Sequence, residues 1–194
     1  GKSMAANMLA AYYGCQYDSH NQFDSLKIAA SDSYEKHINM YNVISINMQE
    51  FLSNSETIEE MLSLLKSRLL FEVKIQYKDC VLFDETNLTF SLQDIYAQKQ
   101  IPFVVLIDEW DCIFREKQQD MEGQKKYLDF LRDWLKDKEY IALAYMTGIL
   151  PIKKYGSHSA LNMFAEFSMA NQRELEEFVG FTEAEVKKIC EEYQ

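Results

Sequence analysis

The first three residues of this chain, Gly1-Lys2-Ser3, have the types and the order that end a phosphate-binding loop, G-x-x-x-x-G-K-[ST]. In such a loop the backbone N–H groups surround the phosphates, the lysine ammonium neutralises the phosphate oxygens, and the hydroxyl binds Mg²⁺. A flexible terminus or a cloning remnant can have the same three residues. The remainder of the chain has to decide between these interpretations.

Two adjacent carboxylates, Asp108 and Glu109, follow the apolar run Phe103 to Ile107. Such a run is typical of a strand buried on both faces of a parallel sheet, and ligands bind where these strands end. An aspartate at this place, the Walker B pattern, holds Mg²⁺ beside a nucleotide, and a glutamate directly after it can activate water as a general base. The alternative is a strand that ends in two solvated acids. Because Gly1-Lys2-Ser3 supplies the other half of a magnesium-phosphate site in the right order, we favour the catalytic interpretation.

A third strand is expected over Ile141 to Thr147, after an amphipathic helix over Gln124 to Lys136. In P-loop ATPases that insert a strand between the phosphate-loop and Walker B strands, the next strand often ends in a polar side chain. That side chain contacts the γ-phosphate or the attacking water, and Thr147 is the candidate for this sensor role. A local cap of the following turn is the alternative for Thr147 and stays open.

Helices and strands are expected to alternate along the chain, as βαβ units require. A helix over Met4 to Tyr13 directs its positive N-terminal end at the phosphates, an inserted strand is expected over Tyr41 to Met48, and further helices begin near Thr57 and Leu92. The predicted fold class is α/β, with a doubly wound, mainly parallel sheet of the P-loop NTPase type and helices on both faces. Its first strand is expected to be missing, because that strand precedes Gly1 in the pattern.

Two regions are expected along the chain. Residues 1–170 form the ATPase-like core, which begins inside the phosphate-binding loop, and residues 171–194 form a small helical end that is interpreted as the start of a lid. A short strand near Met163 to Met169 adds an edge to the sheet. Two helices are expected in the C-terminal region, over Gln172 to Val179 and over Glu183 to Glu192.

The composition indicates one substantial core. The chain has 194 residues, of which 47% are hydrophobic, and a net charge of −11 that disfavours broad binding to nucleic acid. No apolar run is long enough to cross a membrane, so a cytoplasmic location is expected. Four cysteines are too scattered for a disulfide framework or a zinc site, and we expect reduced thiols: Cys15, Cys80, Cys112 and Cys190.

Five segments carry a more specific signal than any motif alone. They are GKSMAANMLAAYY (1–13), VLIDEWD (105–111), TGILPIKKY (147–155), SALNMF (159–164) and FVGFTEAEV (178–186). Together they resemble the bacterial AAA-ATPase-like family, whose members often carry a C-terminal PD-(D/E)XK nuclease-like domain. The chain lacks the strand and the Arg-Pro-Arg-Arg-Phe-like stretch that the family pattern has ahead of this point. No segment of it supplies the Asp…Glu-x-Lys metal site of a nuclease, so nuclease activity is not assigned to it.

The motifs and the resemblance together imply an ATPase that uses ATP and Mg²⁺. Glu109 is the principal catalytic candidate, and no arginine is assigned as a finger. The implied partners are ATP and a fused or associated effector domain, which is nuclease-like in relatives; a homo-oligomer stays open, and no membrane partner is expected. The site residues are Gly1, Lys2 and Ser3 for the nucleotide, Ser3 and Asp108 for the metal, and Glu109, Lys2 and Thr147 for catalysis.

The predicted function is Mg²⁺-dependent ATP hydrolysis that drives a conformational switch in a larger protein. One alternative is a nucleotide-binding regulator that does not hydrolyse ATP, against which the Asp108-Glu109 pair argues. Another is an interaction scaffold that binds no nucleotide, because the front of the phosphate loop is not in the chain. Asp111 is expected to cap or begin the next helix rather than to bind a second metal. The aromatic residues, Trp110 and Trp134 among them, are expected in the core rather than on a base-stacking surface.

Overall fold

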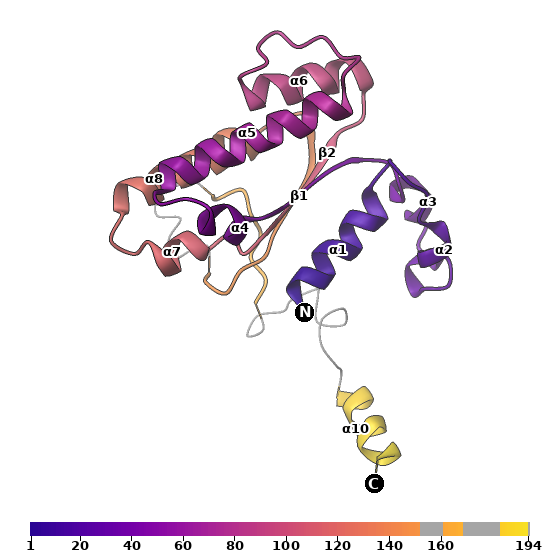
Figure 1. Cartoon of the computed structure of the whole chain (residues 1–194). Helices are drawn as coiled ribbons and strands as arrows, with labels where there is room; N and C mark the ends of the chain where they lie inside the picture. The colour runs from indigo at the N-terminus through magenta and orange to yellow at the C-terminus, as the bar shows by residue number, and fades with distance from the viewer. Residues whose placement is uncertain (152–160, 169–182, 194) are drawn as a thin grey trace.

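Three parallel strands form the centre of the structure, a computed structural model that describes residues 1–151, 161–168 and 183–193 (Figure 1). The strands are β1 (Asn42–Asn47), β2 (Phe103–Asp108) and β3 (Ile141–Met146), in the order β1-β2-β3. The register pairs Asn47 with Asp108 and Ile107 with Met146, so the carboxyl ends of the strands meet at one edge. The predicted parallel α/β sheet is confirmed, and the P-loop type is consistent with this arrangement.

The central strand, β2, is buried along its whole length. Successive residues of a strand point to opposite faces of the sheet. Phe103, Val105 and Ile107 therefore join the main hydrophobic core, whereas the equally buried Val104 and Leu106 face the other side. A continuous apolar run suits a strand that is covered on both faces.

Three helices pack with β2 in the main core. They are α5 (Ile58–Gln76), α6 (Leu88–Lys99) and α8 (Met121–Leu135). A fourth helix, α1 (Lys2–Tyr13), contacts β1 and β2, and Figure 1 shows it on the side of the sheet away from α5 and α8. Helices thus flank the sheet. The N-terminal turn of α1 lies near the edge where β2 ends.

Shorter elements complete the described fold. A small second cluster of buried aromatic and apolar side chains joins the end of α1 to the segment that follows it: Tyr12, Phe23, Tyr34 and Ile38. The remaining helices are α2 (His20–Phe23), the 3₁₀ helix η1 (Lys27–Ala30), α3 (Tyr34–His37), α4 (Met48–Ser53), α7 (Cys112–Glu116) and α10 (Glu183–Glu192).

Side-chain caps explain where two helices differ from the sequence expectation. α6 begins at Leu88, four residues before the expected start at Leu92, because the Asn87 side chain accepts a hydrogen bond from the Phe90 amide at 3.1 Å. α8 begins at Met121 because Asp120 accepts from the Gly123 amide at 2.8 Å. Asparagine and aspartate at these positions satisfy first-turn N–H groups that hydrophobic periodicity does not report.

The C-terminal expectations have mixed outcomes. Of the strand expected near Met163 to Met169, the described residues show a turn over 161–163, no regular structure over 164–167 and a single β-bridge residue at Ser168, so they form no continuous strand. The helix over Glu183 to Glu192 is confirmed as α10, which buries none of its residues. The helix over Gln172 to Val179 lies outside the described residues.

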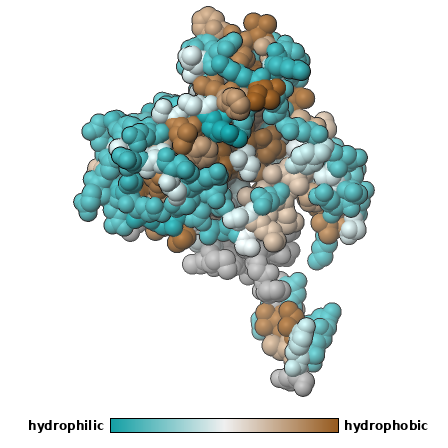
Figure 2. All heavy atoms as spheres, viewed as in Figure 1, coloured by the Kyte–Doolittle hydropathy of each residue, from teal (hydrophilic) through white to brown (hydrophobic). Residues whose placement is uncertain are grey.

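Part of the surface carries exposed apolar residues. Phe71 and Ile75 of α5 are exposed, as are Val81 and Phe83 of the segment that leads to α6. Figure 2 shows hydrophobic residues at the top of the molecule, over this segment and α6. In the described ranges no helix is long and apolar enough to cross a membrane.

Candidate phosphate-binding site

The N-terminal end of α1 is open and carries no acidic residue. Gly1 is the N-cap without a side-chain cap, Lys2 is the first helical residue, and the first turn contains no Asp or Glu. A side chain added at Gly1 would meet nothing within 4 Å. The free N–H groups and the helix dipole of such an end favour an anion. The first turn of α1 is therefore chemically suited to phosphate.

Asp108 ends β2 as a buried, hydrogen-bonded carboxylate. Its side chain accepts from the Thr147 hydroxyl and, at 3.0 Å, from the Glu109 amide. Asp108 as a whole is only 7% exposed. Thr147 directly follows the adjacent strand β3, and its own amide donates to the Ile107 carbonyl at 2.8 Å. The end of β3 thus fixes the carboxylate at the end of β2.

The pKa of Asp108 reflects opposing effects. Burial of the carboxyl raises its pKa. The Ser3 and Thr147 hydroxyls donate hydrogen bonds to the charged form, and the Glu109 amide and the Lys2 charge also favour it. The net result is a pKa below the usual aspartate value, so Asp108 is ionised at neutral pH.

Glu109 turns away from the buried strand. Its φ is 53°, in the left-handed region that is uncommon for residues other than glycine, while its neighbours Asp108 and Trp110 are buried. This conformation directs the Glu109 carboxylate outward, where Oε2 accepts from Arg115 Nη2 and Oε1 lies 3.9 Å from Lys2 Nζ. Uncommon backbone conformations of this kind concentrate at functional sites.

The structure brings the candidate residues together from three elements. Lys2 of α1 approaches Glu109, Ser3 of α1 interacts with Asp108, and Thr147 at the end of β3 also bonds Asp108. Gly1 stands directly before Lys2 as the cap of α1. All of the predicted site residues therefore lie at this one edge of the sheet. The chemical roles of these residues stay predictions.

Asp111 and Arg115 belong to the same neighbourhood, and the sequence did not assign them to it. Asp111 begins α7 as its N-cap residue, as expected, but its side chain does not cap that helix. Instead Asp111 Oδ2 accepts from the amides of Ile149 and Leu150, at 3.0 and 2.8 Å, after β3. Arg115 Nε lies 3.5 Å from the same oxygen. The sequence signal for the contact between Asp111 and Arg115 is their four-residue spacing, which places an acid and a base on the same face of a helix.

Gly148 allows this close packing after β3. A Cβ at Gly148 would lie 2.6 Å from Asp111 Oδ1 and 2.6 Å from Trp110 Nε1. The segment after Thr147 is therefore packed directly against the turn that carries Glu109.

A magnesium ion fits the donors present. Asp108 offers an ionised carboxylate and Ser3 a hydroxyl, and Mg²⁺ commonly takes one or two protein ligands together with waters and substrate phosphates. A larger cluster, with three or more His, Cys, Asp or Glu side chains placed to hold a metal, does not occur among the described residues.

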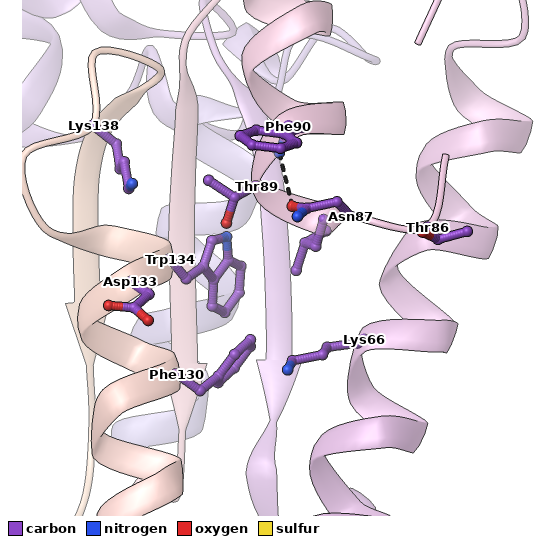
Figure 3. Close-up of a pocket in the computed structure, with 10 residues that line it drawn as sticks. Lys66, Thr86, Asn87, Thr89, Phe90, Phe130, Asp133, Trp134 and Lys138 are labelled. Carbon is purple, nitrogen blue, oxygen red and sulfur yellow. Dashed lines mark hydrogen bonds between the residues drawn. The ribbon is translucent and has the colours of Figure 1, made fainter. Parts of the chain in front are cut away.

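A separate surface pocket lies between α5, α6 and α8 (Figure 3). Its volume is about 390 Å³, and Figure 3 shows Trp134 and Phe130 of α8 opposite Lys66 of α5, with Asn87 and Phe90 above them. None of the candidate phosphate-site residues lines it. This pocket is therefore separate from the candidate phosphate-binding site at the carboxyl edge of the sheet.

Comparison with known proteins gives one family. The family described as "Predicted AAA-ATPase" (AAA-ATPase-like) matches residues 1–157, which include every candidate site residue. The resembling segments 159–164 and 178–186 lie beyond the match. Neither a curated protein nor a solved structure matches the chain significantly.

Proposed function

The chain belongs to the predicted AAA-ATPase family, and from this premise we propose that it binds ATP with Mg²⁺ and hydrolyses it at the carboxyl edge of the sheet. Membership in the family implies nucleotide binding or hydrolysis in general terms. The observation that carries the specific proposal is the meeting of α1 with the end of β2, where Lys2 Nζ lies 3.9 Å from Glu109 Oε1 and Ser3 interacts with Asp108.

The phosphates are proposed to bind at the first turn of α1. The Lys2 ammonium, 46% exposed in its side chain, is free to turn from Glu109 to the β and γ oxygens. The N–H groups after Gly1 add donors from the backbone. This part of the site supplies affinity and orientation.

The metal is proposed to bind to Ser3 and Asp108. When bound, Mg²⁺ neutralises developing charge on the phosphate oxygens. Thr147 and the Glu109 amide hold Asp108 in place before any ligand arrives, so the carboxylate needs no reorganisation.

Glu109 is proposed as the general base. Its carboxylate is 24% exposed in the side chain and stands beside the lysine that would hold the phosphates. Thr147 is proposed as the sensor of the γ-phosphate, because it already joins β3 to Asp108. Hydrolysis would then change the contacts at the end of β3, and we propose that this change drives a switch in an attached or associated effector domain.

A binding experiment tests the phosphate end of this proposal. The protein is titrated with ATP and Mg²⁺ in a calorimeter, beside Lys2→Ala and the control Lys138→Ala, whose lysine lines the separate pocket. Loss of a charge-assisted contact predicts about a tenfold to hundredfold weaker binding for Lys2→Ala and no change for the control. Equal affinity of Lys2→Ala and the wild type would rule out phosphate binding at α1.

A further inference from the structure

One arginine, Arg115 of α7, lies between two carboxylates of the preceding turn. Its Nη2 donates to Glu109 Oε2, and its Nε lies 3.5 Å from Asp111 Oδ2. The side chains are 28% exposed for Arg115, 24% for Glu109 and 0% for Asp111. The guanidinium therefore joins a partly exposed acid to a fully buried one.

The buried acid is a fixed anchor. Asp111 Oδ2 also accepts from the Ile149 and Leu150 amides, which hold it to the segment after Thr147. Asp111 Oδ1 and Arg115 Nε have no hydrogen-bond partner among the described residues, although both are buried. A buried carboxylate without a nearby cation is costly, so Arg115 is held at this position by Asp111 as well as by Glu109.

The partly exposed acid, Glu109, has a cation near each of its carboxylate oxygens. Glu109 Oε2 is bound by Arg115, and Oε1 lies 3.9 Å from Lys2 Nζ. The two contacts differ: the Arg115 bond is a direct hydrogen bond from a side chain that also lies beside Asp111, whereas the Lys2 contact is long and its side chain is 46% exposed. A ligand with phosphate oxygens would compete with Glu109 for Lys2 first, because the Lys2 contact is the longer of the two.

We infer that Arg115 is a positioning residue that holds Glu109 by Oε2 so that Oε1 is free for the attacking water once Lys2 turns to phosphate. This inference rests on the proposed ATP hydrolysis. In that step the water proton passes to Glu109 Oε1, the water oxygen bonds the γ-phosphorus, and the bond from that phosphorus to the β-phosphate oxygen breaks to give ADP and phosphate. Arg115 exchanges no proton and contacts no reacting atom.

Arg115 also links Glu109 to the segment after β3. Because Asp111 holds both Arg115 and the amides after Thr147, a movement of that segment is transmitted to Glu109 through one buried side chain. The orientation of the base thus depends on the end of β3. Neutral replacement of Arg115 removes this link while leaving Lys2, Ser3 and Asp108 unchanged.

The test compares steady-state ATP hydrolysis of the wild type, Arg115→Gln and Arg115→Lys, with Arg132→Gln as a control on the exposed side of α8. Misplacement of the base predicts that kcat falls about tenfold to a hundredfold in Arg115→Gln, with KM for ATP changed less than about twofold. Arg115→Lys should recover part of kcat, because it restores the charge but not the two-sided contact. Arg132→Gln should match the wild type.

The possible results separate the positioning role of Arg115 from the proposed ATP hydrolysis. A wild type that hydrolyses ATP while Arg115→Gln keeps its kcat overturns the positioning role and leaves the proposed function standing. A wild type that binds ATP with Mg²⁺ but does not hydrolyse it overturns the proposed function itself. If thermal melts show that Arg115→Gln does not fold, Arg115→Lys decides: a lowered kcat at unchanged KM supports the role, and wild-type kinetics overturn it.

Discussion

The two halves of the candidate site carry the same chemical group in opposite environments. Around Asp108 the carboxylate is buried and held by hydroxyl and amide donors, whereas around Glu109 it is partly exposed and held by cations. Buried groups of the first kind contribute to stability, because an unmet donor costs free energy in the interior. Partly exposed ion pairs contribute less, because solvent screens them. Two adjacent residues thus have different tasks: the buried Asp108 stabilises the fold and is the proposed metal ligand, whereas the partly exposed Glu109 is the proposed general base.

The backbone makes this separation possible. Asp108 continues the extended strand β2, and Glu109, with φ of 53°, leaves it. Had Glu109 stayed extended, it would have pointed to the face opposite Asp108, into the main core. A left-handed residue between two buried neighbours therefore places an acid at the surface of the site.

The largest expected effect comes from Asp108→Ala. This change removes a proposed metal ligand and leaves the Thr147 hydroxyl and the Glu109 amide without their acceptor, so hydrolysis should be abolished. The free energy of unfolding should also fall by about 1–3 kcal/mol, as measured by urea denaturation. A variant as stable as the wild type would show that the buried Asp108 side chain contributes nothing to the stability of the fold.

Thr147→Val should have a smaller effect on stability. Valine has a similar shape but loses the hydroxyl that donates to Asp108, which should cost about 1 kcal/mol of unfolding free energy and about 2–4 °C in Tm. Without that donor, the pKa of Asp108 should move upward, because the hydrogen bond favours its charged form. The shift is measurable by carboxyl-carbon NMR titration, and an unchanged pKa would show that Thr147 does not hold the carboxylate.

The smallest effect on the fold is expected for Glu109→Asn, and its sign is opposite. Asparagine tolerates the left-handed conformation better than glutamate. The lost ion pairs are partly exposed, with the Glu109 side chain 24% and the Arg115 side chain 28% exposed, and Arg115 keeps its contact with Asp111. The free energy of unfolding should therefore stay equal or rise by less than about 1 kcal/mol. A loss of stability in urea denaturation would show that the exposed half also holds the fold together.

The sequence predicted much of this arrangement because the signals were local. The apolar run Phe103 to Ile107 ended in Asp108 as expected, and its burial on both faces follows from the absence of polar residues. The order Gly1-Lys2-Ser3, Asp108-Glu109, Thr147 placed the candidate residues on elements whose ends meet in a parallel sheet.

The contacts of Asp111 and Arg115 could not be predicted in the same way. Asp111 was expected to cap or begin α7, and it does begin that helix, but its side chain instead binds the amides of Ile149 and Leu150. Such a bond depends on how β3 ends and on the space left at Gly148, which are properties of the folded packing. Arg115 was one of several arginines without an assigned role, and only the left-handed turn at Glu109 brings that carboxylate to it.

The most direct test of the account is phosphate release from ATP by the wild type and by Glu109→Gln, measured with and without Mg²⁺ and beside ATP binding by each protein. If Glu109 is the general base, the wild type should release phosphate only with Mg²⁺, and Glu109→Gln should release it about a hundredfold to ten-thousandfold more slowly while still binding ATP. Equal release by both proteins, or release that does not need Mg²⁺, would contradict it.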